Sequence, residues 1–167
     1  MNDSEINDIL DFAIKTPHIT SISYQPIVFT GRMSHKDREE KRFTKDQLAY
    51  IIEQKHPNIK MLRDWYPMSA TTPMSKLIAA IQGEPSKFML SVHAHCSIAS
   101  YLIVNNNTKE YWAVPSFIDV EPMLKEMNEL AKKTKPGFFS TNLAKLKAFG
   151  LFRKYFINPK PIYHFSL

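Results

Sequence analysis

The residues best suited to chemistry lie together in the segment Ser91-Val-His93-Ala-His95-Cys96. Imidazole nitrogens and a thiolate are good ligands for zinc, iron or copper. In an extended strand, His93 and His95 project from one face and Cys96 from the other. A structural zinc site needs four ligands, so this segment alone supplies too few. Three interpretations stay open: a packed, hydrogen-bonded histidine pair, a metal site completed by other residues, or a Cys96 nucleophile with a histidine base.

The cysteine count limits this chemistry further. The chain has 167 residues and one cysteine, Cys96. That excludes an internal disulfide framework, and also a zinc or iron–sulfur site built on the chain's own cysteines. The sequence has neither a glycine-rich phosphate loop nor an HExxH metal motif. With 44% hydrophobic and 23% charged residues, its composition is that of a folded domain.

A second candidate surface lies near the end of the chain. The net charge is +6, yet residues 1–120 carry 13 basic and 13 acidic side chains, so the excess belongs to residues 121–167. A helix predicted over Ser140–Ile157 combines apolar and basic side chains, namely Leu143, Leu146, Phe149, Phe152 and Phe156 with Lys145, Lys147, Arg153 and Lys154. Such a basic amphipathic helix binds an anionic membrane surface or a partner protein, or packs its phenylalanines on its own domain. Because the charge is confined to the tail, no specific nucleic acid is expected.

The sequence predicts a cytoplasmic protein, peripheral to the membrane if the last helix binds lipid. Asn2–Asp8 is acidic and rich in asparagine, the reverse of a signal peptide. The longest stretch without Lys, Arg, Asp or Glu is Phe88–Thr108, 21 residues that include two histidines, three serines and three asparagines. That stretch is too polar to cross a bilayer.

The elements that would position these residues change in character along the chain. A helix over Ile6–Ile14, capped by Ser4, and a strand over Ile19–Gln25 form an α/β step that ends at Pro26. The fold class is therefore α/β at the front, passing to α+β behind. The further predicted elements are a solvated loop or exposed short helix over Gly31–Lys45, a helix over Thr44–Lys55 capped by Thr44, and a helix over Pro73–Gln82 with Leu77, Ile78 and Ile81 inside and Gly83 at its C-cap. A strand over Phe88–Val92, a β-hairpin joining Ala99–Val104 to Glu110–Phe117, and a helix over Glu121–Lys133 follow.

Two divisions of the chain follow from this order. Residues 1–135 form the main region, and residues 136–167 form the basic helix and tail. Lys135-Pro-Gly137 is the expected hinge between them.

Four blocks of the sequence, in order, resemble one group of radical SAM enzymes, which includes the archaeal tetraether lipid synthases and the methanopterin-type radical SAM methyltransferases. The blocks are Tyr24-Gln-Pro-Ile-Val-Phe-Thr-Gly-Arg32; Asp64-Trp-Tyr-Pro67 with Pro73-Met-Ser-Lys-Leu77 and Gly83-Glu-Pro85; His93-Ala-His-Cys-Ser97 with Tyr101-Leu102; and Phe117-Ile-Asp-Val120. Together they span most of residues 5–130.

The resemblance implies that the chain corresponds to the C-terminal part of such an enzyme. It would begin at the last helix–strand step of a partial (β/α) barrel and continue into an α+β region with a hairpin. Gln25 and Arg32 would then lie at the C-terminal end of a barrel strand and face cofactor or substrate. His93, His95 and Cys96 would line the neighbouring region, with Cys96 a candidate metal or cluster ligand.

The departures from the group decide what the chain is expected to do alone. It has no CxxxCxxC loop, and Val92 and Ala94 replace a cysteine and a proline of the group's histidine motif. One thiolate cannot hold an iron–sulfur cluster. We therefore expect no cofactor bound by this chain alone, with [4Fe–4S] and S-adenosylmethionine implied only for a cluster-bearing partner or a full-length relative. The chain would complete a split enzyme or be a non-catalytic remnant; the alternative is a non-enzymatic binding module that uses the basic helix.

Overall fold

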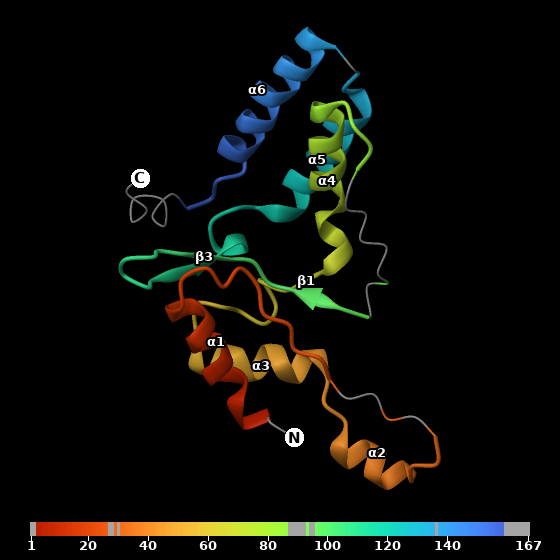
Figure 1. Cartoon of the computed structure of the whole chain (residues 1–167), viewed down its shortest axis with the longest axis vertical. Helices are drawn as coiled ribbons and strands as arrows, with labels where there is room; N and C mark the ends of the chain where they lie inside the picture. The colour runs from red at the N-terminus through yellow and green to blue at the C-terminus, as the bar shows by residue number, and fades with distance from the viewer. Residues whose placement is uncertain are drawn as a thin grey trace. The chain divides into compact units, whose positions relative to one another are not determined.

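The computed structural model describes residues 3–26, 29, 31–86, 93, 96–135 and 137–158. Its described elements mix helices with two small, two-stranded sheets (Figure 1). The chain divides into two compact units. Unit 1 comprises Met1–Arg63 and Ile103–Trp112, and unit 2 comprises Asp64–Leu102 and Ala113–Leu167. The predicted division at residue 135 and the predicted partial barrel both stay predictions.

Unit 1 is built on two helices that pack together, α1 (Ile6–Lys15) and α3 (Lys45–Lys55). Each helix buries apolar residues at intervals of three or four, which is the spacing of one helical face. The buried residues are Ile6, Leu10 and Ile14 of α1 and Leu48, Ala49 and Ile52 of α3. Both predicted helices are confirmed.

The predicted caps of these helices have different outcomes. Thr44 and Gln47 form a reciprocal capping box at the start of α3, which satisfies two amides that the helix leaves unpaired. Ser4 does not cap α1, because it lies within a 3₁₀ turn, η1 (Asp3–Glu5), and Glu5 takes the N-cap position without a side-chain bond.

The charged segment Gly31–Lys45 contains a short exposed helix, α2 (His35–Lys41). A short exposed helix was one of the two forms predicted for this segment, the other being a solvated loop. Ser34 caps it by accepting from the Asp37 amide at 3.0 Å. In contrast, no strand forms over the predicted Ile19–Gln25, since residues 19–26 pair with no other strand among the described residues. An extended segment becomes a strand only when a neighbour supplies ladder hydrogen bonds, and a sequence pattern alone cannot supply one.

The predicted hairpin is confirmed by β3 (Leu102–Val104) and β4 (Tyr111–Ala113). Its turn is held by the Asn105 side chain, whose Oδ1 accepts from the amides of Asn107 and Thr108 at 2.9 and 3.2 Å. Asparagine favours this local bonding in turns. The chain passes between the two units within each of these strands.

Unit 2 contains the other sheet, in which β1 (Tyr66–Pro67) pairs antiparallel with β2 (Ile98–Ala99). The sequence did not indicate β1. After the 3₁₀ turn η2 (Met68–Thr71), α4 (Thr72–Gln82) ends at Gly83, whose φ of 71° gives the left-handed cap that glycine allows. The predicted strand over Phe88–Val92 lies outside the described residues.

Three helices of unit 2 contact one another: α4, α5 (Val120–Lys133) and α6 (Phe138–Lys154). A 3₁₀ turn, η3 (Val114–Ser116), precedes α5. The core side chains include Leu77, Met123, Met127 and Ala144. Ile78, expected inside α4, is exposed because Leu77 takes the buried position.

The sequence left open whether α6 packs its phenylalanines on its own domain. Among the side chains of this helix that the structure describes, Ala144 is the buried one, with Ala148 and Leu151 half-buried. Leu146 and Phe149 are 71% and 74% exposed. Small side chains allow two helices to approach closely, and periodicity alone does not distinguish a small inner face from a large apolar outer one.

Candidate functional site

The predicted histidine–cysteine segment forms a turn rather than an extended strand at its described positions. The Cys96 amide donates to the His93 carbonyl at 2.8 Å, and both residues are exposed. The strand alternation that would separate His93 from Cys96 therefore does not apply. His95 lies outside the described residues. Among the residues that the structure describes, no three His, Cys, Asp or Glu side chains gather where they could hold a metal ion.

Gln25 and Arg32 are both exposed in unit 1, whereas His93 and Cys96 belong to unit 2. Gly31 precedes Arg32 with a φ of 86°, a conformation that glycine adopts without strain. The amide of Gln25 and the guanidinium of Arg32 are thus open to solvent and available to a ligand. Their predicted role at a substrate stays a prediction.

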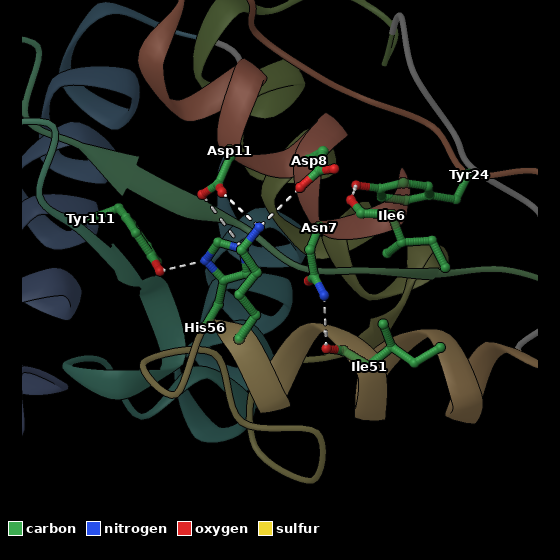
Figure 2. A network of polar contacts seen from close by, with 9 residues as sticks. Ile6, Asn7, Asp8, Asp11, Tyr24, Ile51, His56 and Tyr111 are labelled. Carbon is green, nitrogen blue, oxygen red and sulfur yellow. Dashed lines mark hydrogen bonds and ion pairs between the residues drawn. The ribbon is translucent and has the colours of Figure 1, made fainter. Parts of the chain in front are cut away.

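A polar network that the sequence did not reveal lies in unit 1 and centres on His56, the C-cap of α3 (Figure 2). The ring is buried, with 3% of the residue exposed. Its Nδ1 lies 2.7 Å from the Tyr111 hydroxyl of β4. Its Nε2 has no hydrogen-bond partner and lies 3.8 Å from Asp11 Oδ1 of α1. One imidazole therefore connects three segments far apart in the sequence.

Lys55 forms ion pairs with two carboxylates of this network, those of Asp8 and Asp11. Its Nζ lies 3.0 Å from Asp8 Oδ1 and 3.0 Å from Asp11 Oδ2. The hydrogen bond from Lys55 lowers the pKa of Asp11. The hydrogen bonds to Asp11 and Asp8 raise the pKa of Lys55. Both groups therefore stay charged around neutral pH, which fixes the carboxylate beside the His56 ring.

Two further bonds involve α1, and both are drawn in Figure 2. The Tyr24 hydroxyl donates to the Ile6 carbonyl at 2.8 Å. The side-chain amide of Asn7 donates through Nδ2 to the Ile51 carbonyl at 3.4 Å. Burial raises the pKa of Tyr24 to about 12. The segment after α1 is thus held to α1 through Tyr24, without a strand ladder.

The pKa values of His56 and Tyr111 decide what the Asp11–His56–Tyr111 network can do chemically. Burial lowers the pKa of His56, an effect partly offset by the Asp11 carboxylate. Burial, followed by the Asp11 charge, raises the pKa of Tyr111. At neutral pH the imidazole is therefore neutral and the phenol keeps its proton. The contact between His56 and Tyr111 is therefore a hydrogen bond between two neutral groups, which we expect to stabilise unit 1.

Sequence reasoning missed this network for a definite reason. His56 precedes Pro57 and serves as the end of a helix, which is a sufficient local explanation for it. Its partner Tyr111 lies 55 residues away. A local pattern carries no signal for a contact of that sequence separation.

The basic residues predicted on the last helix separate into two sets in unit 2. Lys154 Nζ lies 2.5 Å from Glu126 Oε1 of α5, and the Tyr155 hydroxyl donates to the same oxygen at 2.7 Å. Lys145, Lys147 and Arg153 are exposed and contact no acidic side chain within the described residues. Lys154 therefore attaches α6 to α5, while the other three cations face solvent. No helix among the described residues combines the length and apolar character needed to span a membrane.

Comparison with known proteins gives one informative similarity. No protein-family model matches the chain. Over 130 residues it is 30% identical to the 7,8-dihydro-6-hydroxymethylpterin dimethyltransferase of Methanocaldococcus jannaschii. The aligned part is 77% of this chain but only 25% of that protein, so the chain spans about a quarter of the curated relative it matches. The chain is therefore similar to a part of a pterin dimethyltransferase, which is consistent with the resemblance to radical SAM proteins but does not point to tetraether lipid synthases.

Proposed function

We propose that this chain supplies the C-terminal, cluster-free part of a radical SAM methyltransferase-like enzyme and that a separate cluster-bearing chain completes it. The observation that carries the proposal is the 30% identity over 130 residues to a quarter of a pterin dimethyltransferase. Alone, the chain is expected to be catalytically silent. The cytoplasm is the expected compartment.

The donor set of the chain supports the need for a partner. A [4Fe–4S] cluster is held by several thiolates, and Cys96 is the one cysteine in the sequence. Cys96 is also exposed, so it lacks the enclosed environment in which clusters are held. The residues of this chain do not fit a cluster. Cluster and S-adenosylmethionine chemistry is accordingly assigned to the partner.

The substrate class follows from the relative's name and from the side chains available here. A reduced pterin presents a carbonyl, an amino group and ring nitrogens along one edge. A carboxamide such as that of Gln25 both donates and accepts hydrogen bonds, and a guanidinium such as that of Arg32 donates several in a plane. We assign Gln25 and Arg32 to recognition of a polar heterocycle of this kind. His93, His95 and Cys96 stay candidates for contact with the substrate or cofactor, as the family resemblance implies.

An anaerobic affinity purification from native extract tests the partnership. The expected result is co-elution, at near-equal stoichiometry, of an iron-containing protein that carries a CxxxCxxC loop. Elution of the chain alone and without iron, under anaerobic conditions that preserve clusters, would contradict the split-enzyme proposal and favour a non-catalytic remnant.

Variants then test the assigned residues within the recovered pair. Arg32→Gln is expected to weaken binding of a reduced pterin, because a bidentate charged donor is lost. Arg38→Gln, an exposed arginine of α2, is the matched control. Equal pterin affinity of the Arg32→Gln pair and the unaltered pair would remove Arg32 from the site.

A further inference from the structure

We propose that the outer face of α6 binds the surface of an anionic lipid membrane. This inference does not depend on the proposed methyltransferase role. The outer face is defined by Leu143, Leu146, Phe149 and Phe152 with Lys145, Lys147 and Arg153. All of these side chains are exposed, in a helix whose opposite face is packed within unit 2 (Figure 1).

The apolar part of this face has the width that an interfacial helix presents. Leu143, Leu146, Phe149 and Phe152 follow at intervals of three residues. Each step turns the direction of the side chain by about 60°, so the four cover about half of the helix circumference. Four large apolar side chains on one exposed face form a contiguous patch, which soluble proteins seldom leave without a partner.

The cations are placed to meet lipid headgroups. On the helical wheel, Lys147 lies about 40° outside Leu143 at one edge of the apolar part, and Lys145 lies about 20° inside Phe152 near the other. Arg153, in the last turn, projects between the directions of Leu146 and Phe149. Long basic side chains lay their aliphatic stems along an apolar surface while the charged ends reach headgroup phosphates.

Charge complementarity selects an anionic occupant. Lys145, Lys147 and Arg153 have no acidic partner among the described residues, and the sequence contains no Asp or Glu after Glu129. Each exposed Lys or Arg near an anionic membrane contributes attraction that depends on ionic strength. This face offers such a membrane three uncompensated positive charges.

The same composition argues against a protein groove. The cores of protein–protein interfaces are depleted in lysine, whereas lysines border both edges of this face. Helices that bind in grooves are also usually enclosed on several sides. Because one face of α6 is already packed in unit 2, the exposed half is convex and fits a planar surface.

Co-sedimentation with lipid vesicles tests the proposal. The whole chain is mixed with phosphatidylcholine vesicles, either pure or containing one third phosphatidylglycerol. Binding is expected only to the anionic vesicles at about 0.1 M salt, with release at about 1 M, where the screening length falls from roughly 10 to 3 Å. Failure to bind anionic vesicles at low salt would overturn the proposal.

Paired variants separate this face from the rest of the molecule. Leu146→Ser with Phe149→Ser is expected to lower the partition coefficient by more than about tenfold, since two exposed apolar side chains are lost. Lys145→Gln with Lys147→Gln is expected to lower it by roughly 25-fold at low salt, given the usual contribution of each cation. The matched controls are Leu62→Ser with Phe12→Ser, at residues 95% and 63% exposed in unit 1, and Lys36→Gln with Arg38→Gln on α2.

The remaining outcomes are also decisive. Unchanged binding by both α6 variants, or an equal loss in the controls, would overturn the assignment of this face. If the unaltered chain is oligomeric without lipid and the Leu146→Ser, Phe149→Ser variant is monomeric, the face is a protein interface and the proposal is wrong. Unfolding curves of all variants are expected to coincide, because the substituted side chains are exposed.

Discussion

The His56 network of unit 1 and the outer face of α6 in unit 2 place polar and apolar groups in opposite ways. In unit 1, the buried imidazole of His56 lies 2.7 Å from the hydroxyl of the half-buried Tyr111. On α6, leucine and phenylalanine side chains face solvent between lysines. Buried polar groups are tolerated when they find partners, and exposed apolar groups in a patch indicate a contact surface. We therefore assign the first region to stability and propose the second as a binding surface.

The two regions are expected to differ most in how far an alanine substitution lowers the free energy of unfolding. Ile52 is 1% exposed in α3, so Ile52→Ala removes packed atoms and leaves a cavity, which is expected to lower the free energy of unfolding by about 2–5 kcal/mol. Phe149→Ala on α6 is expected to change it by less than about 0.5 kcal/mol. Urea unfolding of both variants measures this, and equal losses would mean that Phe149 is packed.

A smaller effect is expected from the buried hydrogen bond. Tyr111→Phe removes the hydroxyl that pairs with His56 Nδ1 and leaves a buried ring nitrogen without a partner. The expected loss in the free energy of unfolding is about 1–3 kcal/mol. Tyr50→Phe, at an exposed tyrosine of α3, is the control. No difference between these two variants would exclude a stabilising role for the bond.

Acidification should distinguish the two regions next. Because burial lowers the pKa of His56, the unfolded chain takes up a proton before the folded chain does. The stability contributed by the neutral imidazole is complete above the unfolded pKa of about 6.5 and decreases as the pH falls below it. Unfolding curves across this range are expected to show that decrease. It should be reduced in His56→Gln and kept in His35→Gln, an exposed histidine of α2.

The smallest effect concerns the attachment of α6. Glu126 accepts from both Lys154 and Tyr155, and the Lys154 bond lowers its pKa. Glu126→Gln keeps the shape but weakens both bonds. Amide hydrogen exchange is expected to become faster in α6 while it stays unchanged in α1 and α3. Equal acceleration in all three helices would indicate general destabilisation instead.

Helices were predictable here where local signals sufficed. Thr44 marked the start of α3, and Gly83 marked the end of α4. The strand expected over Ile19–Gln25 did not form, because pairing depends on a neighbour that the local sequence does not specify. The paired segments β1 and β2 are two residues each, too short for an alternating pattern to indicate them.

The candidate sites show the same limit. Clustering of His93 and Cys96 was evident from their closeness in sequence, but their turn geometry was not. Periodicity found the apolar and basic residues of α6, but it left open whether the apolar side chains face the domain or the solvent. Ala144 fills the inner position because close helix packing favours a small side chain, and nothing in a hydrophobic pattern ranks alanine above phenylalanine there.

Reconstitution tests most directly whether this chain is one part of a methyltransferase. The chain is combined anaerobically with the cluster-bearing protein that co-purifies with it, and transfer of isotopically labelled methyl groups to a reduced pterin is measured. We expect methylated pterin from the pair and none from either protein alone. Methylation by the cluster-bearing protein at the same rate with and without this chain would contradict it.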